Sequence, residues 1–381
     1  MKGAERIEHI KEYYFSKKLS EINQLIKQGK PIINLGIGSP DLMPPTSVIE
    51  AMTNATKQKE NHGYQSYRGI LELRKTISDF YKKYYQVEIN PENEVIPLMG
   101  SKEGIMHISM AFLNTNDKVL IPNPGYMTYQ SATLLAGGKP IYYNLKEENN
   151  WLPDLKRLSK LNLDNVKLMW INYPHMPTGA KANDDFFKEI IAFAKTHNIL
   201  VINDNPYSFI LNDEPLSLLK YDQSFNNILE LNSLSKSHNM AGWRIGMLLG
   251  KKEHIDNVMK FKSNMDSGMF LGTQLAAIEA LNQPKEWFRK INETYKKRKI
   301  IAEKIFDSLD ISYQKNQVGL FLWGKLPNHQ KSKEFSDWLL YKKHIFMAPG
   351  FIFGSNGDNY IRLSLTNDEK TLEQVLKRLE K

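Results

Sequence analysis

One lysine of the 381-residue chain stands among small hydroxyl side chains, in the run Ser233-Leu234-Ser235-Lys236-Ser237. Arg244 follows a short distance downstream. Serine hydroxyls and a two-pronged guanidinium can together hold a phosphate group, and a lysine amine can form a Schiff base with a carbonyl carbon. The stretch therefore predicts covalent chemistry on a lysine that lies beside a bound phosphate.

Further polar residues follow apolar runs of the chain. Asp204 comes directly after the run 199–203, and Lys236 lies a few residues beyond the run 228–231. Gly100 and Ser101 follow another run and precede a helical stretch, an arrangement that commonly binds anions. Because ligands collect beyond the carboxyl ends of parallel strands, we expect the carboxylate and the amine to meet at one edge of a sheet.

The elements that must position these residues are short apolar runs alternating with longer helical stretches between Glu94 and Gly250. The expected strands are 95–99, 118–121, 140–143, 166–171, 199–203, 228–231 and 247–249. This rhythm is typical of a largely parallel sheet with helices on both faces.

The pattern changes after about residue 282. A long charged helix, 286–309, is followed by short strands near 319–323 and 360–365 and by a final helix, 368–381. These elements predict a second, smaller α+β lobe. The amphipathic, helical segment before Asn34 is expected to pack with this lobe rather than with the sheet.

The spacing Ser233-x-Ser235-Lys236, then Gly242-x-Arg244-x-Gly246, resembles the cofactor-lysine signature of the class I/II aminotransferases, which depend on pyridoxal 5'-phosphate (PLP). Matching segments in the family's order are Leu35 to Asp41, Tyr64 with Gly69 and Leu73-Arg74, Gly100-Ser101-Lys102, Pro124 to Tyr129, Pro177-Thr178-Gly179, Asp204 with Tyr207, Pro349-Gly350, Phe353-Gly354 and Tyr360 to Leu363. The resemblance covers nearly the whole chain.

This resemblance implies the α/β fold of PLP-dependent transferases of fold type I, that of aspartate aminotransferase. A large PLP-binding domain, residues 46–282, would hold a mostly parallel seven-stranded sheet. A small α+β domain would combine residues 283–381 with an N-terminal arm, residues 1–45.

The resemblance also implies a role for each cofactor residue. Lys236 would hold PLP covalently and shuttle a proton, Asp204 would keep the pyridine nitrogen protonated, and Tyr207 would donate to the ring's phenolate oxygen. Tyr126 would stack on the ring. The expected cofactor-binding residues are Tyr64, Gly100, Ser101, Lys102, Tyr126, Asp204, Tyr207, Ser233, Ser235, Lys236 and Arg244.

For the substrate, the resemblance implies that Arg362 clamps the α-carboxylate, helped by the backbone of Gly38. The counterpart of Tyr64 in the family reaches the phosphate of the neighbouring subunit, which implies a homodimer with shared active sites. The expected activity is transfer of an amino group between an amino acid and a 2-oxo acid, with glutamate and 2-oxoglutarate as one pair.

The sequence departs from the family pattern at two places. The family has Asn immediately before Pro-Thr-Gly, where it donates to the phenolate oxygen of PLP, but Met176 stands there and cannot donate. Either His175 or Asn172 replaces this donor, or the enzyme works with one donor fewer. The region 261–274, from which some relatives supply a second arginine to acidic substrates, has no Arg. Its Met265, Met269 and Phe270 suggest an apolar or neutral side-chain pocket, or plain core.

Composition excludes other classes of protein. The chain has no cysteine, so a disulfide framework or a cysteine-based metal site or nucleophile is impossible, and no metal is expected. Its net charge of +9 is spread among acidic residues along helices, which does not indicate nucleic-acid binding. The charged start of the sequence and the lack of a long apolar run predict a cytoplasmic protein that does not bind membranes.

Two other functions remain compatible with the motifs. The same scaffold supports β-elimination from sulfur amino acids, and the motifs do not separate this lyase reaction from transamination. A non-catalytic PLP-binding regulator would carry an N-terminal DNA-binding module, and too few residues precede Gly36 for such a module. The sequence favours the aminotransferase and leaves its amino-acid substrate and its pathway open.

Overall fold

The computed structural model describes residues 2–8, 10 and 14–380 of the chain. Residues 1, 9, 11–13 and 381 lie outside the described part, so the expectations for the N-terminal segment and for the end of the final helix are tested only around them.

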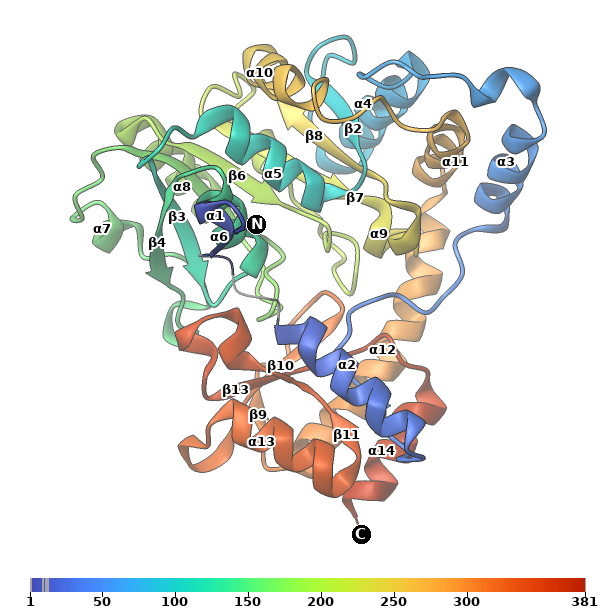
Figure 1. Cartoon of the computed structure of the whole chain (residues 1–381), viewed down its shortest axis with the longest axis vertical. Coiled ribbons are helices and arrows are strands. Elements are labelled where there is room, and N and C mark those ends of the chain that lie inside the picture. Colours follow the sequence, from blue (N-terminus) through green and yellow to red (C-terminus); the bar gives the residue numbers. More distant parts are fainter. Residues whose placement is uncertain (1, 9, 11–13, 381) are drawn as a thin grey trace.

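The large domain is built on a seven-stranded sheet with the strand order β2-β8-β7-β6-β5-β3-β4, drawn in the upper part of Figure 1. Its strands are β2 Val95–Leu98, β3 Lys118–Asn123, β4 Lys139–Asn144, β5 Val166–Ile171, β6 Leu200–Asp204, β7 Ile228–Ser233 and β8 Gly246–Gly250. Strand β8 runs antiparallel to both of its neighbours, and the other pairs are parallel. All the expected strands are therefore confirmed, with small shifts at their ends.

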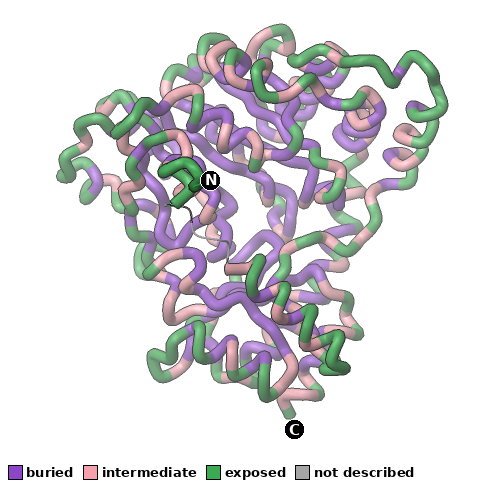
Figure 2. Tube along the Cα trace, viewed as in Figure 1, coloured by how far each residue is buried: buried purple, intermediate pink, exposed green. Residues whose placement is uncertain are grey.

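Alternation of side chains along the strands builds a core on each face of this sheet. In β5, Leu168 and Trp170 belong to one hydrophobic cluster, whereas Met169 and Ile171 belong to the other. The first cluster is covered by α5 Ser101–Phe112, α6 Met127–Leu135 and α10 Lys252–Lys262. The second is covered by α4 Leu71–Tyr85, α8 Asp184–His197 and α11 Leu271–Leu281. Figure 2 shows the sheet as a buried layer between them.

The small domain is built on the long helix α12 Lys285–Asp307 and an antiparallel sheet with the order β12-β13-β10-β9. The strands of this sheet are β9 Ser312–Tyr313, β10 Phe321–Lys325, β12 Ala348–Pro349 and β13 Tyr360–Ser364, and the further helices of the domain are α13 Ser332–Trp338, η6 Leu339–Lys343 and α14 Glu369–Leu379. The α+β character expected after residue 282 is confirmed. The domain boundaries at 45/46 and 282/283 stay predictions.

The N-terminal segment contacts both domains. Helix α2, Tyr14–Lys27, packs on the small domain, where Ile22 is buried with Leu340 and Phe346. Strand β1, Ile33–Asn34, pairs with β11, Ile345–Phe346, of the same domain. The short helix α1, Glu5–Glu8, lies instead beside α6 of the large domain (Figure 1). The expectation that this segment packs with the small lobe is right for α2 and β1 and wrong for α1.

Helix α3, Thr46–Thr56, packs on α11. The remaining short elements connect these layers. They are η1 Lys59–His62, η2 Glu147–Asn149, α7 Leu155–Leu158, η3 Leu218–Tyr221, α9 Leu234–Ser237, η4 Ala241–Trp243, η5 Pro327–His329, η7 Gly350–Phe353 and η8 Ser355–Gly357. Within the described residues, no helix has the length and apolar character needed to cross a bilayer.

Candidate active site

A cavity of about 430 Å³ lies between the two domains, at the carboxyl ends of β5, β6 and β7. The cavity is lined by Phe15, Leu19, Gly36, Ile37, Gly38, Ser101, Lys102, Tyr126, Tyr129, Asn172, Met176, Asp204, Pro206, Tyr207, Ser233, Ser235, Lys236, Ala241, Arg244, Phe321, Phe353 and Arg362. Eleven of these are residues expected from the sequence: Gly38, Ser101, Lys102, Tyr126, Asp204, Tyr207, Ser233, Ser235, Lys236, Arg244 and Arg362.

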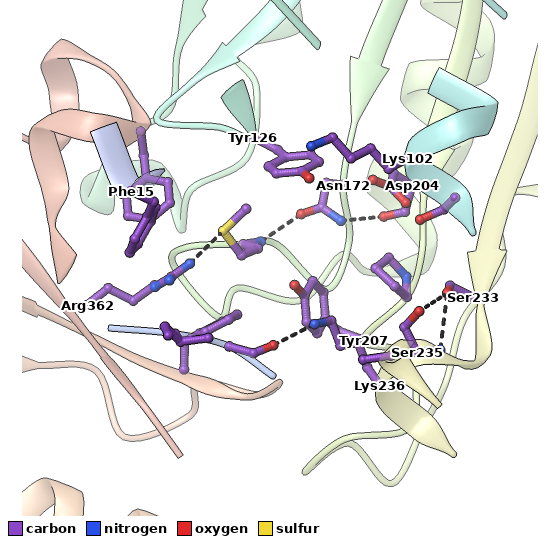
Figure 3. A pocket seen from close by; sticks show the side chains of 18 of the residues that line it. Phe15, Lys102, Tyr126, Asn172, Asp204, Tyr207, Ser233, Ser235, Lys236 and Arg362 are labelled. Atoms are coloured by element: carbon purple, nitrogen blue, oxygen red, sulfur yellow. Dashed lines mark hydrogen bonds between the residues drawn. The ribbon is translucent and has the colours of Figure 1, made fainter. Parts of the chain in front are cut away.

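Lys236 projects into the cavity from α9, the short helix that directly follows β7 (Figure 3). Its Nζ donates a 2.6 Å hydrogen bond to the carbonyl oxygen of Gly38. Burial, together with a smaller effect of the positive charges of Arg362 and Arg244, lowers the pKa of Lys236 to about 8. A fraction of this amine is therefore neutral near pH 7, and a neutral amine can act as a nucleophile or accept a proton.

Asp204 ends β6 on the same side of the sheet. Its Oδ2 accepts a 2.9 Å hydrogen bond from the hydroxyl of Tyr129, while its buried Oδ1 has no hydrogen-bond partner among the described residues. Burial raises the pKa of Asp204 to about 7. A carboxylate with one unpartnered buried oxygen suits a ligand that brings a cationic N–H donor.

The start of α5 and the side chain of Arg244 form an anion-binding corner of the cavity. Gly100 has φ +88°, and a Cβ at this position would lie 2.2 Å from Nη2 of Arg244, so only glycine lets the guanidinium approach the helix N-terminus. Gly100 itself does not line the cavity. Ser233 and Ser235 complete the corner, with 2.8 Å between their hydroxyl oxygens. Free helix N–H groups, hydroxyls and a guanidinium are the donors that a phosphate needs.

Arg362 enters the cavity from β13 of the small domain and is buried. Its Nη2 donates a 2.7 Å hydrogen bond to the carbonyl oxygen of Gly36, and its Nη1 contacts Sδ of Met176 at 3.3 Å. Figure 3 shows Arg362 on the far side of the cavity from Ser233 and Ser235. The anion-binding corner and Arg362 are thus separated by the space that contains Lys236.

Asn172 and His175, the two residues that could replace the missing Asn donor, lie differently with respect to the cavity. Asn172 lines the cavity, its Nδ2 donates to the backbone oxygen of Asp204, and its Oδ1 accepts a 2.8 Å hydrogen bond from the Met176 N–H. His175 is not among the residues that line the cavity, and its Nδ1 lies 2.8 Å from the hydroxyl of Thr178. Burial lowers the pKa of His175 to about 3, so this imidazole is neutral.

Tyr64 stands apart from the cavity of its own chain. Its side chain is 94% exposed, beyond η1. Neither Met265, Met269 nor Phe270 lines the cavity of the same chain. Met269 is buried in the hydrophobic core, as the core alternative expected, whereas Tyr64, Met265 and Phe270 are exposed.

Sequence reasoning assigned no role to several lining residues. Tyr129 was visible only as part of a matching segment, although its hydroxyl holds Asp204. Phe15, Leu19 and Phe321 carried no signal, because an apolar residue in a helix or strand does not reveal which surface it faces. Their place at the cavity follows from the contact between α2 and the small domain.

The chain was compared with known proteins. The family model "Aminotransferase class I and II" matches residues 30–379. The LL-diaminopimelate aminotransferase of Halothermothrix orenii is 39% identical over 381 residues, covering 100% of this chain and 98% of the relative. The enzyme of the same name from Aquifex aeolicus is 39% identical over 378 residues, covering 99% of this chain and 98% of the relative. Substrate-bound BacF from Bacillus subtilis has a TM-score of 0.95 at 34% identity, covering 100% of this chain and 97% of the BacF chain.

The chain therefore belongs to the class I and II aminotransferases, which use PLP. It is an enzyme of the transferase class with the aspartate-aminotransferase fold, as expected from the sequence. The described residues fit this cofactor: Asp204, whose Oδ1 has no hydrogen-bond partner among them, lines the cavity and suits a protonated ring nitrogen, and the corner at Gly100 and Arg244 suits a phosphate.

Proposed function

We propose that this aminotransferase moves an amino group between an amino acid and a 2-oxo acid, with glutamate and 2-oxoglutarate as one pair. The observation that carries the proposal is the presence of Lys236, Asp204 and Arg362 in one cavity. When bound, PLP supplies a carbonyl carbon that accepts the amino group and a ring that withdraws electrons.

The roles proposed for the chain's residues follow from their positions. Lys236 holds the cofactor and carries a proton at Nζ, which its lowered pKa favours. Asp204 keeps the ring nitrogen protonated, Tyr207 and Tyr126 contact the ring, and Arg362 binds the substrate α-carboxylate. The backbone N–H groups of Ser101 and Lys102, the hydroxyls of Ser233 and Ser235, and the guanidinium of Arg244 would hold the phosphate.

The proposal extends to assembly. We propose a homodimer in which Tyr64 of each subunit serves the phosphate of the other. The support is the exposure of Tyr64 at 94% and of the nearby Tyr67 and Met265 at 45% and 49%. The loop that holds Tyr64 and Tyr67 and the loop that follows Met265 lie side by side, since a Cβ on Gly268 would be 2.6 Å from the carbonyl oxygen of Gln65. The cytoplasmic location stays a prediction from the sequence.

Two enzymatic alternatives are separated by product analysis. The purified protein is incubated with an amino acid and 2-oxoglutarate, and separately with cystathionine. We expect glutamate in the first assay, whereas pyruvate and a thiol from the second would favour the β-lyase. The names of the relatives favour the aminotransferase and make LL-diaminopimelate a first donor to include.

The lysine provides the decisive variant. Lys236→Ala should abolish turnover and leave PLP bound through the phosphate, because the covalent link and the proton carrier are lost together. Lys290→Ala, which removes an exposed lysine of α12, is the matched control. Substantial turnover by Lys236→Ala would refute the proposed site.

A further inference from the structure

The cavity has two chemically different ends. Hydroxyls, Lys102 and Arg244 lie at the end near α5, whereas Phe15, Phe321 and Phe353 surround Arg362 at the other end. Leu19, one helical turn from Phe15, and Ile37, between Gly36 and Gly38, also line the cavity. Since the first end suits the phosphate, the second must receive the substrate.

Helix α2 supplies one wall of the substrate end. Phe15 and Leu19 are one helical turn apart, and both are partly exposed. Ile22, on the same side of the helix, is buried against Leu340 and Phe346, so α2 is fixed on the small domain with Phe15 and Leu19 at the cavity. Ile37 adds a further apolar surface and is 40% exposed. Apolar side chains that remain accessible inside a cavity gain free energy when an apolar ligand covers them.

Three aromatic rings also surround the arginine that would bind the α-carboxylate. The guanidinium carbon of Arg362 lies 3.9 Å from the ring centroid of Phe321, 4.7 Å from that of Phe353 and 5.6 Å from that of Phe15. Figure 3 shows Phe15 beside Arg362. A substrate held there by its carboxylate has aromatic and aliphatic surfaces next to its α-carbon.

The charges of the cavity oppose a second ammonium group on the substrate. Among the described residues that line it, Asp204 is the single acidic side chain, and it lies at the cofactor end. The cations Lys102, Lys236, Arg244 and Arg362 line the same cavity. Among the described residues of one chain, a distal ammonium at the substrate end would therefore lose its hydration without gaining a carboxylate partner, which is costly.

Resting on the proposed transamination, we propose that the second amino acid is hydrophobic, with an aliphatic or aromatic side chain that packs on Phe15, Leu19 and Ile37. Glutamate and 2-oxoglutarate carry a distal carboxylate and no distal ammonium. The side chain of Lys102, which ends beside Tyr126 in Figure 3, offers that carboxylate a cation. The two substrates of the exchange thus use different walls of one cavity.

Donor preference and ligand binding test this subsite in the holoenzyme. Single-turnover conversion is measured with phenylalanine, leucine, glutamate and LL-diaminopimelate. Calorimetry measures binding of the unreactive carboxylates 3-phenylpropionate and glutarate. The wild type should prefer phenylalanine or leucine to LL-diaminopimelate by at least about tenfold in kcat/KM.

The variants attribute this preference to α2. Phe15→Ala and Leu19→Ala should each lower kcat/KM for the hydrophobic donors and affinity for 3-phenylpropionate by about tenfold, with a much smaller effect on glutarate. Ile26→Ala, an exposed position of the same helix, is the control. Leu19→Glu adds an acid to the wall and should shift preference toward a donor with a distal ammonium.

Two failures are distinguishable. A wild-type preference for LL-diaminopimelate, or an equal loss for all donors in Phe15→Ala, overturns the hydrophobic subsite while transamination stands. A wild type that converts none of the donors overturns the proposed function itself.

Discussion

At the residue scale, the chemistry of the site depends on carboxyl and amine groups whose pKa values are changed by burial. The carboxylate of Asp204 accepts a hydrogen bond from Tyr129 and is also stabilised by the side chain of Ser101, but burial outweighs both and raises its pKa to about 7. In the protein without PLP, this side chain gives up hydration that it keeps in the unfolded chain. The arrangement favours cofactor binding at the expense of the stability of the empty protein.

The first prediction concerns the pH dependence of that stability. A folded pKa above the unfolded value of about 4 means that stability from Asp204 is fully present below pH 4 and is lost as pH rises through about 7. Asp204→Asn should remove this loss and stabilise the PLP-free protein at pH 8 by up to about 4 kcal/mol. Urea unfolding of the PLP-free wild type and of Asp204→Asn at pH 5 and pH 8 measures this difference in stability. If the free energy of unfolding changes equally with pH in the two proteins, the prediction is contradicted.

The second prediction concerns Met176, whose sulfur contacts Arg362 where the family has an amide donor. An Asn there would donate to the phenolate oxygen of PLP and weaken its hold on the nearby proton. A hydrogen bond to a charged group contributes roughly 1.5–3 kcal/mol, and a pKa unit corresponds to about 1.4 kcal/mol. Met176→Asn should therefore lower the pKa of the lysine-bound chromophore by about one unit.

A pH titration of the absorbance of the lysine-bound chromophore checks the shift in its pKa, with Asn172→Ala and His175→Ala measured alongside. No shift in Met176→Asn together with an upward shift in Asn172→Ala would mean that Asn172 already donates. The same pattern with His175→Ala would identify the histidine instead.

At the scale of elements, α2 connects the small domain to the substrate end of the cavity. Its attachment uses Ile22 in an apolar cluster and a 3.0 Å ion pair between Lys18 and Asp337. The helix contributes few buried residues of its own, and its contacts to the small domain hold Phe15 and Leu19 in place. A change in this attachment is therefore expected to alter substrate binding.

The third prediction tests that coupling. Ile22→Ala leaves a cavity beside Leu340 and should destabilise the docked helix by roughly 2–4 kcal/mol. Hydrogen exchange over 14–27 should become faster, and KM for a hydrophobic donor should rise more than kcat falls. Ile26→Ala should change neither. Unchanged exchange in Ile22→Ala would show that α2 is fixed by other contacts.

At the scale of the molecule, the sequence predicted what depends on local pattern. The strands of the large sheet were found because apolar β-prone runs alternate with helical ones, and most site residues follow the ends of those runs. The placement of α1 and the roles of Phe15, Leu19 and Phe321 were missed. These depend on how separate elements dock, and apolar periodicity shows that a face is buried without showing what covers it.

The last prediction concerns the proposed dimer, in which each site combines Lys236 of one subunit with Tyr64 of the other. Tyr64→Phe removes a hydroxyl that would donate to the phosphate, a loss of roughly 1.5–3 kcal/mol or about 10- to 150-fold in PLP affinity. Tyr142→Phe, on β4, is the control for a partly exposed hydroxyl. Light scattering should find a dimer for the wild type and for both variants.

Mixed dimers separate a shared site from a site within one chain. A subunit with Lys236→Ala and a subunit with Tyr64→Phe together form one complete site only if Tyr64 acts across the interface, because the second subunit then combines its own Lys236 with the intact Tyr64 of the first. We expect this mixed dimer to bind one PLP covalently with wild-type affinity, while neither parent does. A mixed dimer whose covalent site keeps the weak affinity of Tyr64→Phe would place Tyr64 in the site of its own chain, and a monomer with full PLP affinity would refute the shared site altogether.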